Sequence, residues 1–229
     1  MITVVEPGWS WVEPPDFEHM AQHLEMCGRT CYKSEERITD DSAEKFVRMI
    51  CKNKHVSVLE HCSFSARIVC SRACSHQIVR HRIAAYSQES QRYCNYGKKN
   101  SLAVICPPSI GLEPGDYERD QHNCNFFVDG LHFEPNMIQQ VWLDSVTNDY
   151  YSYEKLMGKG IKPEDARFLL PNACKTELIM TMNLRTWMHV FQERALNPHA
   201  QWEVRGIFHD LYSHVKDKLP CVFGRLNQE

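Results

Sequence analysis

Residues 64–81 read FSARIVCSRACSHQIVRH and contain a strand pattern followed directly by a helix pattern. Apolar side chains recur at every second position from Phe64 to Cys70, which is typical of a half-buried strand. Ser71 stands where a helix N-cap is expected, and the helix is predicted to run to about His81. The segment therefore introduces both kinds of regular structure, and the rest of the chain continues the mixture.

The remaining periodic segments are also divided between strands and helices, so the fold class predicted is α+β. Strands are predicted at 2–5, 102–106 and 177–181. Helices are predicted at 15–26, from 41 through 50, at 136–157, from 163 to before 171, from 183 through 191 and from 198 through 215. Residues 84–97 are predicted to be a loop, and residues 109–130 a turn-rich stretch.

Helix ends are predicted from single residues. Gly28 is expected to stop the first helix, and Gly158 the long one. Asp41 with Glu44 three residues later resembles a capping box. Asn183 is expected to cap the helix that follows it.

Length and composition favour one domain. The chain has 229 residues, 43% of them hydrophobic, and no Gly/Ser-rich or Pro-rich linker divides it, so residues 1–229 are expected to form a single domain. There is no apolar run of twenty residues, and no basic region followed by an apolar stretch at the N-terminus. We therefore expect no membrane span, no signal peptide and a cytoplasmic location.

The eleven cysteines are interpreted as reduced, mostly buried thiols. Cys70 and Cys74 have three residues between them, which is helical spacing and differs from the two-residue spacing of zinc ribbons. A zinc site formed by these two cysteines and His76 would lack a fourth ligand, so no metal site is predicted.

Positive charge is concentrated in one segment of an acidic chain. The net charge is −3, yet residues 61–92 contain five arginines and one acid, Glu89, which gives +4. Arginine forms paired hydrogen bonds with phosphate, so the segment is suited to a small polyanion. A solvated loop with a salt bridge from Glu89 would also explain this pattern.

Three clusters of polar residues are candidates for chemistry. The first is His61, just before the strand at Phe64. The second comprises residues 80–82 and the polar stretch 86–93, and the third comprises polar residues of the predicted helix after Asn183, preceded by Arg167 and followed by His199. On that helix Arg185 and His189 share a face, which could also be a plain exposed polar stripe.

The order and spacing of these clusters resemble the flavin-dependent thymidylate synthases. The blocks that carry the resemblance are Glu60-His61, Arg80-His81-Arg82 with Ser90 and Arg92-Tyr93, Leu170-Pro171 with Thr176, Asn183-Leu184-Arg185 with Arg194, and residues 199–203, HAQWE. The similarity extends from roughly residue 55 to residue 215. The chain departs from the family's pattern at Ser87-Gln88, where the family often has Asn-Glu.

The resemblance implies an enzyme that converts dUMP to dTMP. It implies FAD as the cofactor, 5,10-methylenetetrahydrofolate as the one-carbon donor and NADPH as the reductant. It also implies a homotetramer with an antiparallel β-sheet core flanked by long α-helices and active sites at subunit interfaces. Small-molecule substrates are expected, and neither nucleic acid nor a membrane is expected as a partner.

The resemblance also assigns roles to individual residues. Arg194 is expected to polarise the uracil ring, and His61 and Ser90 complete the catalytic set. FAD contacts are expected from Ser63, Arg80, His81, Arg82, Gln88, Asn183, Arg185 and His189. Substrate contacts are expected from Gln77, Arg80, Gln88, Glu89, Ser90, Gln91, Arg92, Arg167 and Arg194. His199 is expected close to the flavin and the folate.

Two other functions compete with this interpretation. A transferase with a cysteine nucleophile would need a thiol beside a base, and no cysteine occurs between His76 and Tyr93. A nucleic-acid-binding module would place arginines on phosphates and stack tyrosines 86, 93 and 96 on bases. Its binding would be steeply salt-dependent, whereas a synthase should prefer dUMP.

Overall fold

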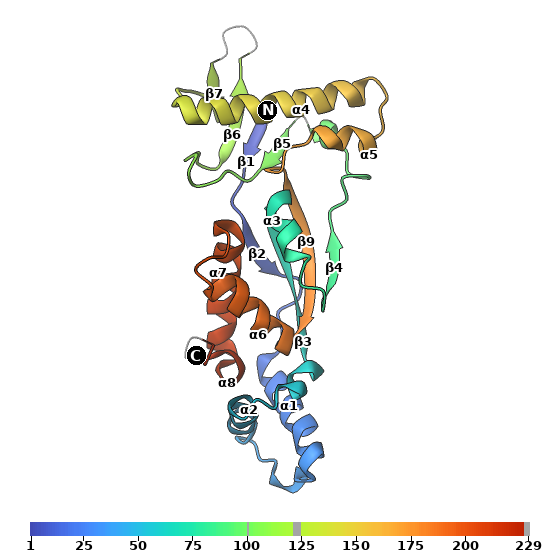
Figure 1. Cartoon of the computed structure of the whole chain (residues 1–229), viewed down its shortest axis with the longest axis vertical. Coiled ribbons are helices and arrows are strands. Elements are labelled where there is room, and N and C mark those ends of the chain that lie inside the picture. Colours follow the sequence, from blue (N-terminus) through green and yellow to red (C-terminus); the bar gives the residue numbers. More distant parts are fainter. Residues whose placement is uncertain (100, 121–124, 227–229) are drawn as a thin grey trace. The chain divides into compact units, whose positions relative to one another are not determined.

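The computed structural model describes residues 1–99, 101–120 and 125–226 and is shown in Figure 1. The chain divides into two compact units, each made of three segments. Unit 1 contains Met1–Gly8, Val69–Gln77 and Gln88–Leu178. Unit 2 contains Trp9–Ile68, Ile78–Ser87 and Ile179–Glu229. Because the segments alternate along the chain, neither unit is a continuous piece of sequence.

Unit 1 is built on a five-stranded sheet of order β5-β1-β6-β7-β8. Its strands are β1 (Ile2–Val4), β5 (Leu102–Val104), β6 (Gly115–Arg119), β7 (Phe126–Val128) and β8 (Leu131–Phe133). β1 runs parallel to β5, and the other three pairings are antiparallel. The strands predicted at 2–5 and 102–106 are thus confirmed.

The long helix α4 (Met137–Gly158) supplies much of the core of unit 1. Asn136 caps it in a capping box with Gln139, so the predicted start is confirmed. Leu143, Val146, Tyr150 and Tyr153 are buried in one cluster with the sheet. Ile138 and Val141 of the same helix lie outside this core, because their side chains are 56% and 62% exposed.

The stretch 109–130 contains β6, β7 and the start of a hairpin, which the prediction of a turn-rich segment missed. Asp129 and Gly130, both with positive φ, join β7 to β8. Asp-Gly between two apolar runs is a strong hairpin signal, and it was present in the sequence. Residues 121–124 of this stretch lie outside the described residues.

The second sheet has the order β2-β3-β9-β4. Its strands are β2 (Gly8–Trp11), β3 (Ser63–Ser71), β4 (Ala85–Gln88) and β9 (Lys175–Asn183). The hydroxyl groups of Ser65 and Thr181 lie 2.7 Å apart, and the backbone N–H of Leu184 donates to the carbonyl of Cys62. Moving back along the chain from Ser65 therefore corresponds to moving forward from Thr181, so β3 and β9 run antiparallel. β4 lies within the predicted loop 84–97, so that prediction is partly wrong.

Helices make up most of unit 2. They are α1 (Phe17–Tyr32), α2 (Ala43–Lys52), α6 (Leu184–Val190), α7 (Trp202–Lys218), α8 (Pro220–Phe223), the 3-10 helices η1 (Glu35–Arg37) and η2 (Val56–His61), and the π-helical turn η5 (Phe191–Leu196). Unit 1 has the shorter α5 (Pro163–Ala166), η3 (Tyr96–Lys99) and η4 (Arg167–Leu169).

Gly28 does not end α1 as predicted. The helix continues to Tyr32 and ends at Lys33, which has a left-handed φ of 49°. Gly28 is buried, and a Cβ atom there would lie 2.5 Å from Cε1 of Phe46 in α2. The glycine therefore permits close packing of two helices, which single-sequence cap rules do not distinguish from a stop signal.

Two other helix starts differ from prediction. Asp41 does not cap α2: the cap position is Ser42, and Asp41 pairs with Lys45 at 2.9 Å. The helix predicted from Pro198, α7, starts at Trp202, because the Gln201 side chain accepts hydrogen bonds from two backbone amides of its first turn. A glutamine cap carries little signal in a sequence.

The segment 64–81 forms β3 and α3 (Arg72–Ile78). Ser71 caps α3 by accepting a hydrogen bond from the backbone of Cys74 at 3.0 Å, as predicted. The helix ends three residues earlier than predicted, so Arg80, His81 and Arg82 follow it in irregular backbone. Among the described residues, no helix is long and apolar enough to cross a membrane.

Candidate active site

In unit 2, one contact joins two of the sequence clusters. Arg194 donates a hydrogen bond from Nε to Nε2 of His81 at 3.0 Å. His189 packs edge-on against His81, with 5.9 Å between ring centroids. Arg194 lies in the π-helical turn η5, a rare geometry that is frequent at functional sites. The predicted catalytic arginine and two predicted FAD residues are therefore neighbours.

The backbone around His81 is fixed by Tyr86. The Tyr86 hydroxyl lies 2.9 Å from the carbonyl oxygens of both Ile78 and His81, and it shares its proton between them. Burial raises the pKa of Tyr86 to about 12, so the hydroxyl remains a donor. This contact holds the turn between α3 and β4 at the point where His81 projects.

His81 is a neutral imidazole at ordinary pH. Burial, together with the charges of Arg194 and His189, lowers the pKa of His81 to about 4. A neutral imidazole can accept a hydrogen bond, whereas an imidazolium can only donate. The contact with Arg194 therefore depends on this depressed pKa.

A cavity of about 510 Å³ in unit 2 collects three of the predicted FAD residues. Asn183, Arg185 and His189 line it together with Val56, Glu60, Ile83, Thr186, Met188 and Gln192. Ile83, which directly follows the Arg-His-Arg segment, is the residue of the lining nearest to that segment in the sequence. Its mixture of apolar side chains, an amide and a cation fits a planar ring system that carries an anionic tail.

The cavity wall is positioned by the start of α6. The Asn183 side chain caps α6 by accepting a hydrogen bond from the Thr186 amide at 2.9 Å, as predicted. Leu184 donates its backbone N–H to the carbonyl of Cys62. Trp187 stacks on Phe64 with centroids 4.5 Å apart and planes 6° apart. These contacts fasten α6 to the beginning of β3.

Arg185 is half-exposed and forms an ion pair with Glu60, another residue of the cavity. Glu60 belongs to the Glu60-His61 block, but no role was predicted for it. Four other predicted residues of this unit, His61, Ser63, Arg80 and Arg82, are exposed, and the cavity lining does not include them. His199 is also exposed, ahead of α7.

In unit 1, two predicted substrate contacts, Arg92 and Arg167, both bond to Glu164. Arg92 pairs with the Glu164 carboxylate at 3.4 Å, and Arg167 donates from Nε to the Glu164 backbone carbonyl at 3.1 Å. The Arg92 side chain is 52% exposed, so an incoming anion can reach it. Glu164 was not predicted. In the sequence Glu164 is an acid in the first turn of the helix predicted from residue 163.

Ser90 organises the turn that presents Arg92. Its hydroxyl accepts a hydrogen bond from the Arg92 amide, and its carbonyl accepts from Tyr93 and Cys94. Gln88 donates to the Thr176 hydroxyl and Gln91 donates to the Cys174 sulfur. Gln77, on α3, is half-buried. The predicted substrate residues 88–92 are therefore ordered by contacts within their own unit.

Glu89 belongs to an internal ionic cluster. Its carboxylate accepts a hydrogen bond from Tyr96 at 3.1 Å and lies 3.5 Å from the ammonium of Lys175, which also pairs with Glu177. The Glu89 amide donates to the Glu177 carbonyl at 2.8 Å. These contacts fasten the predicted substrate loop to β9.

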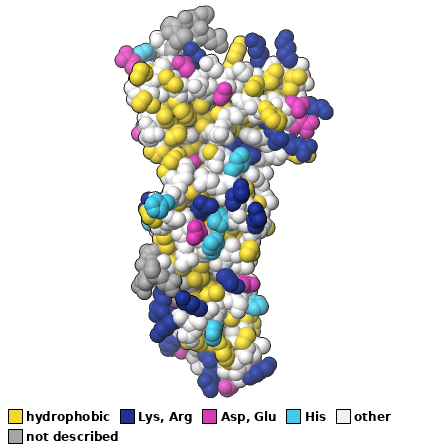
Figure 2. Space-filling view, in the orientation of Figure 1, with side chains coloured by type: hydrophobic (Ala, Val, Ile, Leu, Met, Phe, Trp, Pro, Cys, Tyr) yellow, Lys and Arg dark blue, Asp and Glu magenta, His cyan; other side chains and the backbone are white. Residues whose placement is uncertain are grey.

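The tyrosines do not form a base-stacking surface. Tyr96 is buried, Tyr86 is half-buried with its hydroxyl bound to backbone, and Tyr93 is 79% exposed. On the face drawn in Figure 2, basic and acidic side chains are interspersed. Both observations disfavour the nucleic-acid-binding alternative, which needs successive aromatic platforms along a positive groove.

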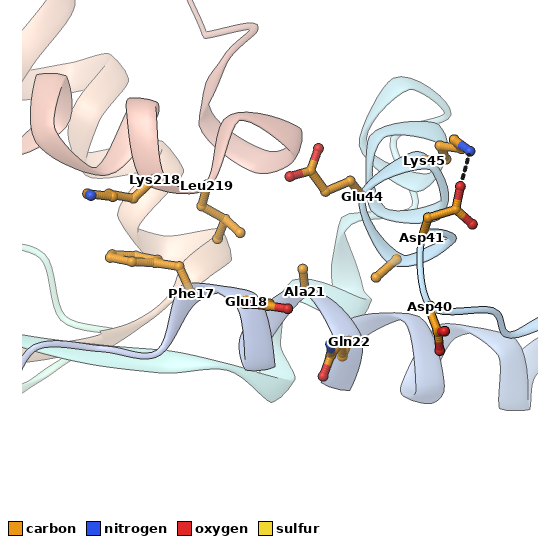
Figure 3. Close-up of a pocket in the computed structure, with 11 residues that line it drawn as sticks. Phe17, Glu18, Ala21, Gln22, Asp40, Asp41, Glu44, Lys45, Lys218 and Leu219 are labelled. Atoms are coloured by element: carbon orange, nitrogen blue, oxygen red, sulfur yellow. Dashed lines mark hydrogen bonds and ion pairs between the residues drawn. The ribbon is translucent and has the colours of Figure 1, made fainter.

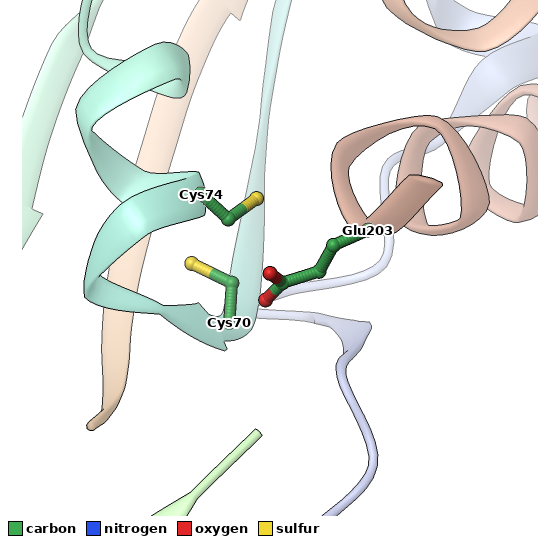
Figure 4. A group of neighbouring side chains, drawn as sticks. All are labelled: Cys70, Cys74 and Glu203. Atoms are coloured by element: carbon green, nitrogen blue, oxygen red, sulfur yellow. The ribbon is translucent and has the colours of Figure 1, made fainter. Parts of the chain in front are cut away.

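The buried cysteines Cys62 and Cys174 are poor candidates for nucleophiles. Burial raises the pKa of the Cys62 and Cys174 thiols to about 11, so both remain protonated. Cys70 and Cys74 are buried near the junction of β3 and α3 (Figure 4), whereas His76 is exposed. His76 therefore does not join these cysteines in a zinc site.

A second cavity of unit 2, of about 500 Å³, is lined by none of the predicted catalytic, FAD or substrate residues. It lies between α1, the start of α2 and the end of α7 (Figure 3). Four acids line it, Glu18, Asp40, Asp41 and Glu44, against Lys45 and Lys218. This lining is unsuited to a nucleotide phosphate.

Comparison with known proteins identifies the family. A family model described as thymidylate synthase complementing protein matches residues 17–221. The chain belongs to this family. Three relatives named flavin-dependent thymidylate synthase are similar to it. The one from Clostridium tetani is 35% identical over 81% of this chain and 71% of its own length, and the one from Pyrococcus furiosus is 37% identical over 79% of this chain and 65% of its own length. The one from Geobacter sulfurreducens is 35% identical over 86% of this chain and 78% of its own length. The chain is accordingly an enzyme of the flavin-dependent thymidylate synthase family.

A solved structure has the same fold as this chain. The UMP/dUMP methylase PolB from Streptomyces cacaoi, bound with 5-Br dUMP, superimposes with a TM-score of 0.74 at 18% identity. The match covers 97% of this chain and 95% of that one. The α+β class predicted from the sequence is confirmed.

Proposed function

We propose that this chain converts dUMP to dTMP with FAD as its flavin, 5,10-methylenetetrahydrofolate as one-carbon donor and NADPH as reductant. The observation that carries the proposal is the contact between Arg194 and His81 beside a cavity lined by Asn183, Arg185 and His189. Family membership supports the flavin and thymidylate synthesis. The solved methylase that binds a dUMP analogue supports the nucleotide substrate.

The residues in the cavity suit FAD. Arg185 supplies a cation for the pyrophosphate, and Asn183 and His189 supply polar groups beside apolar Val56 and Met188. When bound there, FAD would carry the one-carbon unit and supply hydride. The protein then needs to position the cofactor and substrates and to polarise the uracil ring, and it needs no nucleophile of its own.

Arg194 is the residue that polarises dUMP in this proposal. C5 of uracil is a weak nucleophile, and it becomes a stronger one when negative charge develops on the ring at N3 and O2 before the attack. A planar guanidinium can present two parallel N–H groups to that edge and stabilise the charge. Arg92 and Arg167 would hold the phosphate, with Arg92 exchanging the Glu164 carboxylate for the phosphate oxygens.

We further propose that the working form is a homotetramer in which residues of different subunits complete each active site, and that each chain acts as one domain in the cytoplasm. The alternation of the two units along the chain supports the single domain. Light scattering should report four chains of 26.8 kDa. A stable, fully active monomer would contradict the tetramer.

The proposed activity is tested by spectrum and assay together. The purified protein should show, or take up, a bound flavin with a visible absorption spectrum, and it should form dTMP from dUMP, methylenetetrahydrofolate, FAD and NADPH. A chain that folds but neither binds FAD nor forms dTMP would overturn the proposal.

A further inference from the structure

The contact between Arg194 and His81 determines the tautomer of the histidine. An arginine side chain has only donors, and its Nε–H points at Nε2 of His81 at 3.0 Å. Nε2 must therefore carry the lone pair, which leaves the proton on Nδ1. His81 is an acceptor for the guanidinium and cannot act as a donor through the same nitrogen.

The surroundings of His81 preserve this acceptor. Arg194 and His189 are the charged or titratable groups that face it from η5 and α6, Tyr86 faces its backbone from β4, and Arg80 and Arg82 flank it. Nearby cations and burial both disfavour protonation of the ring. The imidazole therefore stays neutral over the pH range in which most enzymes work.

The bond to Nε also determines which part of the guanidinium remains available. Anchoring Nε leaves the two terminal amino groups, Nη1 and Nη2, which form a flat two-donor edge. The backbone of Arg194 is held in the π-helical turn, and its side chain is half-buried. The hydrogen bond to His81 holds its Nε atom. A long flexible side chain is thereby restricted before any ligand arrives.

We propose that His81 is a positioning residue that acts through Arg194, by fixing Nε so that the terminal amino groups face the uracil. The inference rests on the proposed function, because it concerns the same reaction. It gives the central histidine of the Arg-His-Arg segment a task in orienting another side chain, beyond any contact with the cofactor. Preorganised donors of this kind act without reorganisation at the moment of reaction.

A double-mutant cycle separates this role from a direct contact with FAD. His81→Ala should lower kcat for dTMP formation about tenfold or more, with a smaller change in KM for dUMP. In an Arg194→Ala background the same change should alter the rate less than about twofold, because the group it positions is gone. Multiplicative losses in the double variant would overturn the proposal.

Two variants control for folding and for loss of a histidine. His81→Gln keeps a carbonyl that can accept from Nε, so it should retain more of kcat than His81→Ala. Equal loss in both variants would contradict the positioning role. His209→Ala removes an exposed histidine of α7 and should leave kcat unchanged.

Nuclear magnetic resonance of the FAD-free protein tests the contact without the reaction. Nitrogen shifts of His81 should report the Nδ1–H tautomer, and the Arg194 Nε–H should exchange slowly with water. That protection should disappear in His81→Ala and persist in His81→Gln. An Nε2–H tautomer, or unchanged exchange in His81→Ala, would refute the inference. A wild-type protein that forms no dTMP would instead refute the proposed function, and the resonance data would still decide the contact.

Discussion

Glu60 forms an ion pair with Arg185, the cation that is expected to bind the pyrophosphate of FAD. The carboxylate pairs with Arg185 inside the cavity lining, so an incoming pyrophosphate must first displace it. Replacing the acid by its neutral amide, Glu60→Gln, removes the competitor and keeps the shape. We therefore expect this variant to bind FAD more tightly than the wild type.

The size of the effect follows from exposure. The two side chains are 52% and 47% exposed, so the pair lies in a water-like dielectric. Such pairs contribute roughly 0.2–1 kcal/mol. If that free energy returns to the ligand, Kd for FAD should fall by a factor of roughly 1.4–5. The gain should shrink at high salt, because salt screens exposed charges.

The assay is a titration of FAD into the apoprotein, followed by flavin fluorescence at low and high salt. Glu36→Gln is a matched control, because Glu36 pairs with Arg37 on the exposed surface of the same unit. In an Arg185→Ala background, Glu60→Gln should have no effect. Unchanged or weaker binding by Glu60→Gln alone would show that Glu60 does not compete with FAD.

Four other outcomes are expected. Arg92→Ala should weaken dUMP binding by about 1.5–3 kcal/mol and FAD binding less, because one charge-assisted phosphate contact is lost; calorimetric titration with each ligand would expose an equal loss. Cys174→Ser should still form dTMP in the standard assay, since no thiol is needed, and an inactive but folded, FAD-binding variant would contradict this. Gly28→Ala should lower the free energy of unfolding by about 1–3 kcal/mol, because the new Cβ atom would lie 2.5 Å from the Phe46 ring. Urea denaturation measures this change, and unchanged stability would show that α1 and α2 can move apart at no cost. The pKa of His81 is about 4 when folded and 6.5 when unfolded, so stability should fall as pH drops from about 6.5 to about 4, and melting curves of His81→Gln should lack that component.

Local patterns predicted the elements whose causes are local. The alternation from Phe64 to Cys70, the Ser71 cap and the Asn183 cap each depend on neighbours within a few residues, and each is present in the structure. Gly28 was misread because its reason for being glycine is Phe46, eighteen residues away on another helix. Sequence periodicity does not reveal such a partner.

The candidate site shows the same division. Arg194 and His81 were both predicted as functional residues, but from separate motifs 113 residues apart, and their hydrogen bond was not foreseen. The acids Glu60 and Glu164 were given no role because an isolated acid carries no signal until the arginine it meets is known. Recognition of a family supplies residue types, whereas pairing between motifs depends on the folded chain.

The π-helical turn Phe191–Leu196 makes chain length a constraint on this enzyme. An α-helix advances by about 100° per residue, so deleting one residue from the turn would swing Arg194 by about that angle around the helix axis. A substitution at the exposed Glu193 leaves that direction intact. Position 193 should therefore tolerate a change of residue, whereas the turn should not tolerate a change of length, and a set of single deletions across the turn compared with single substitutions at position 193 would reveal the difference.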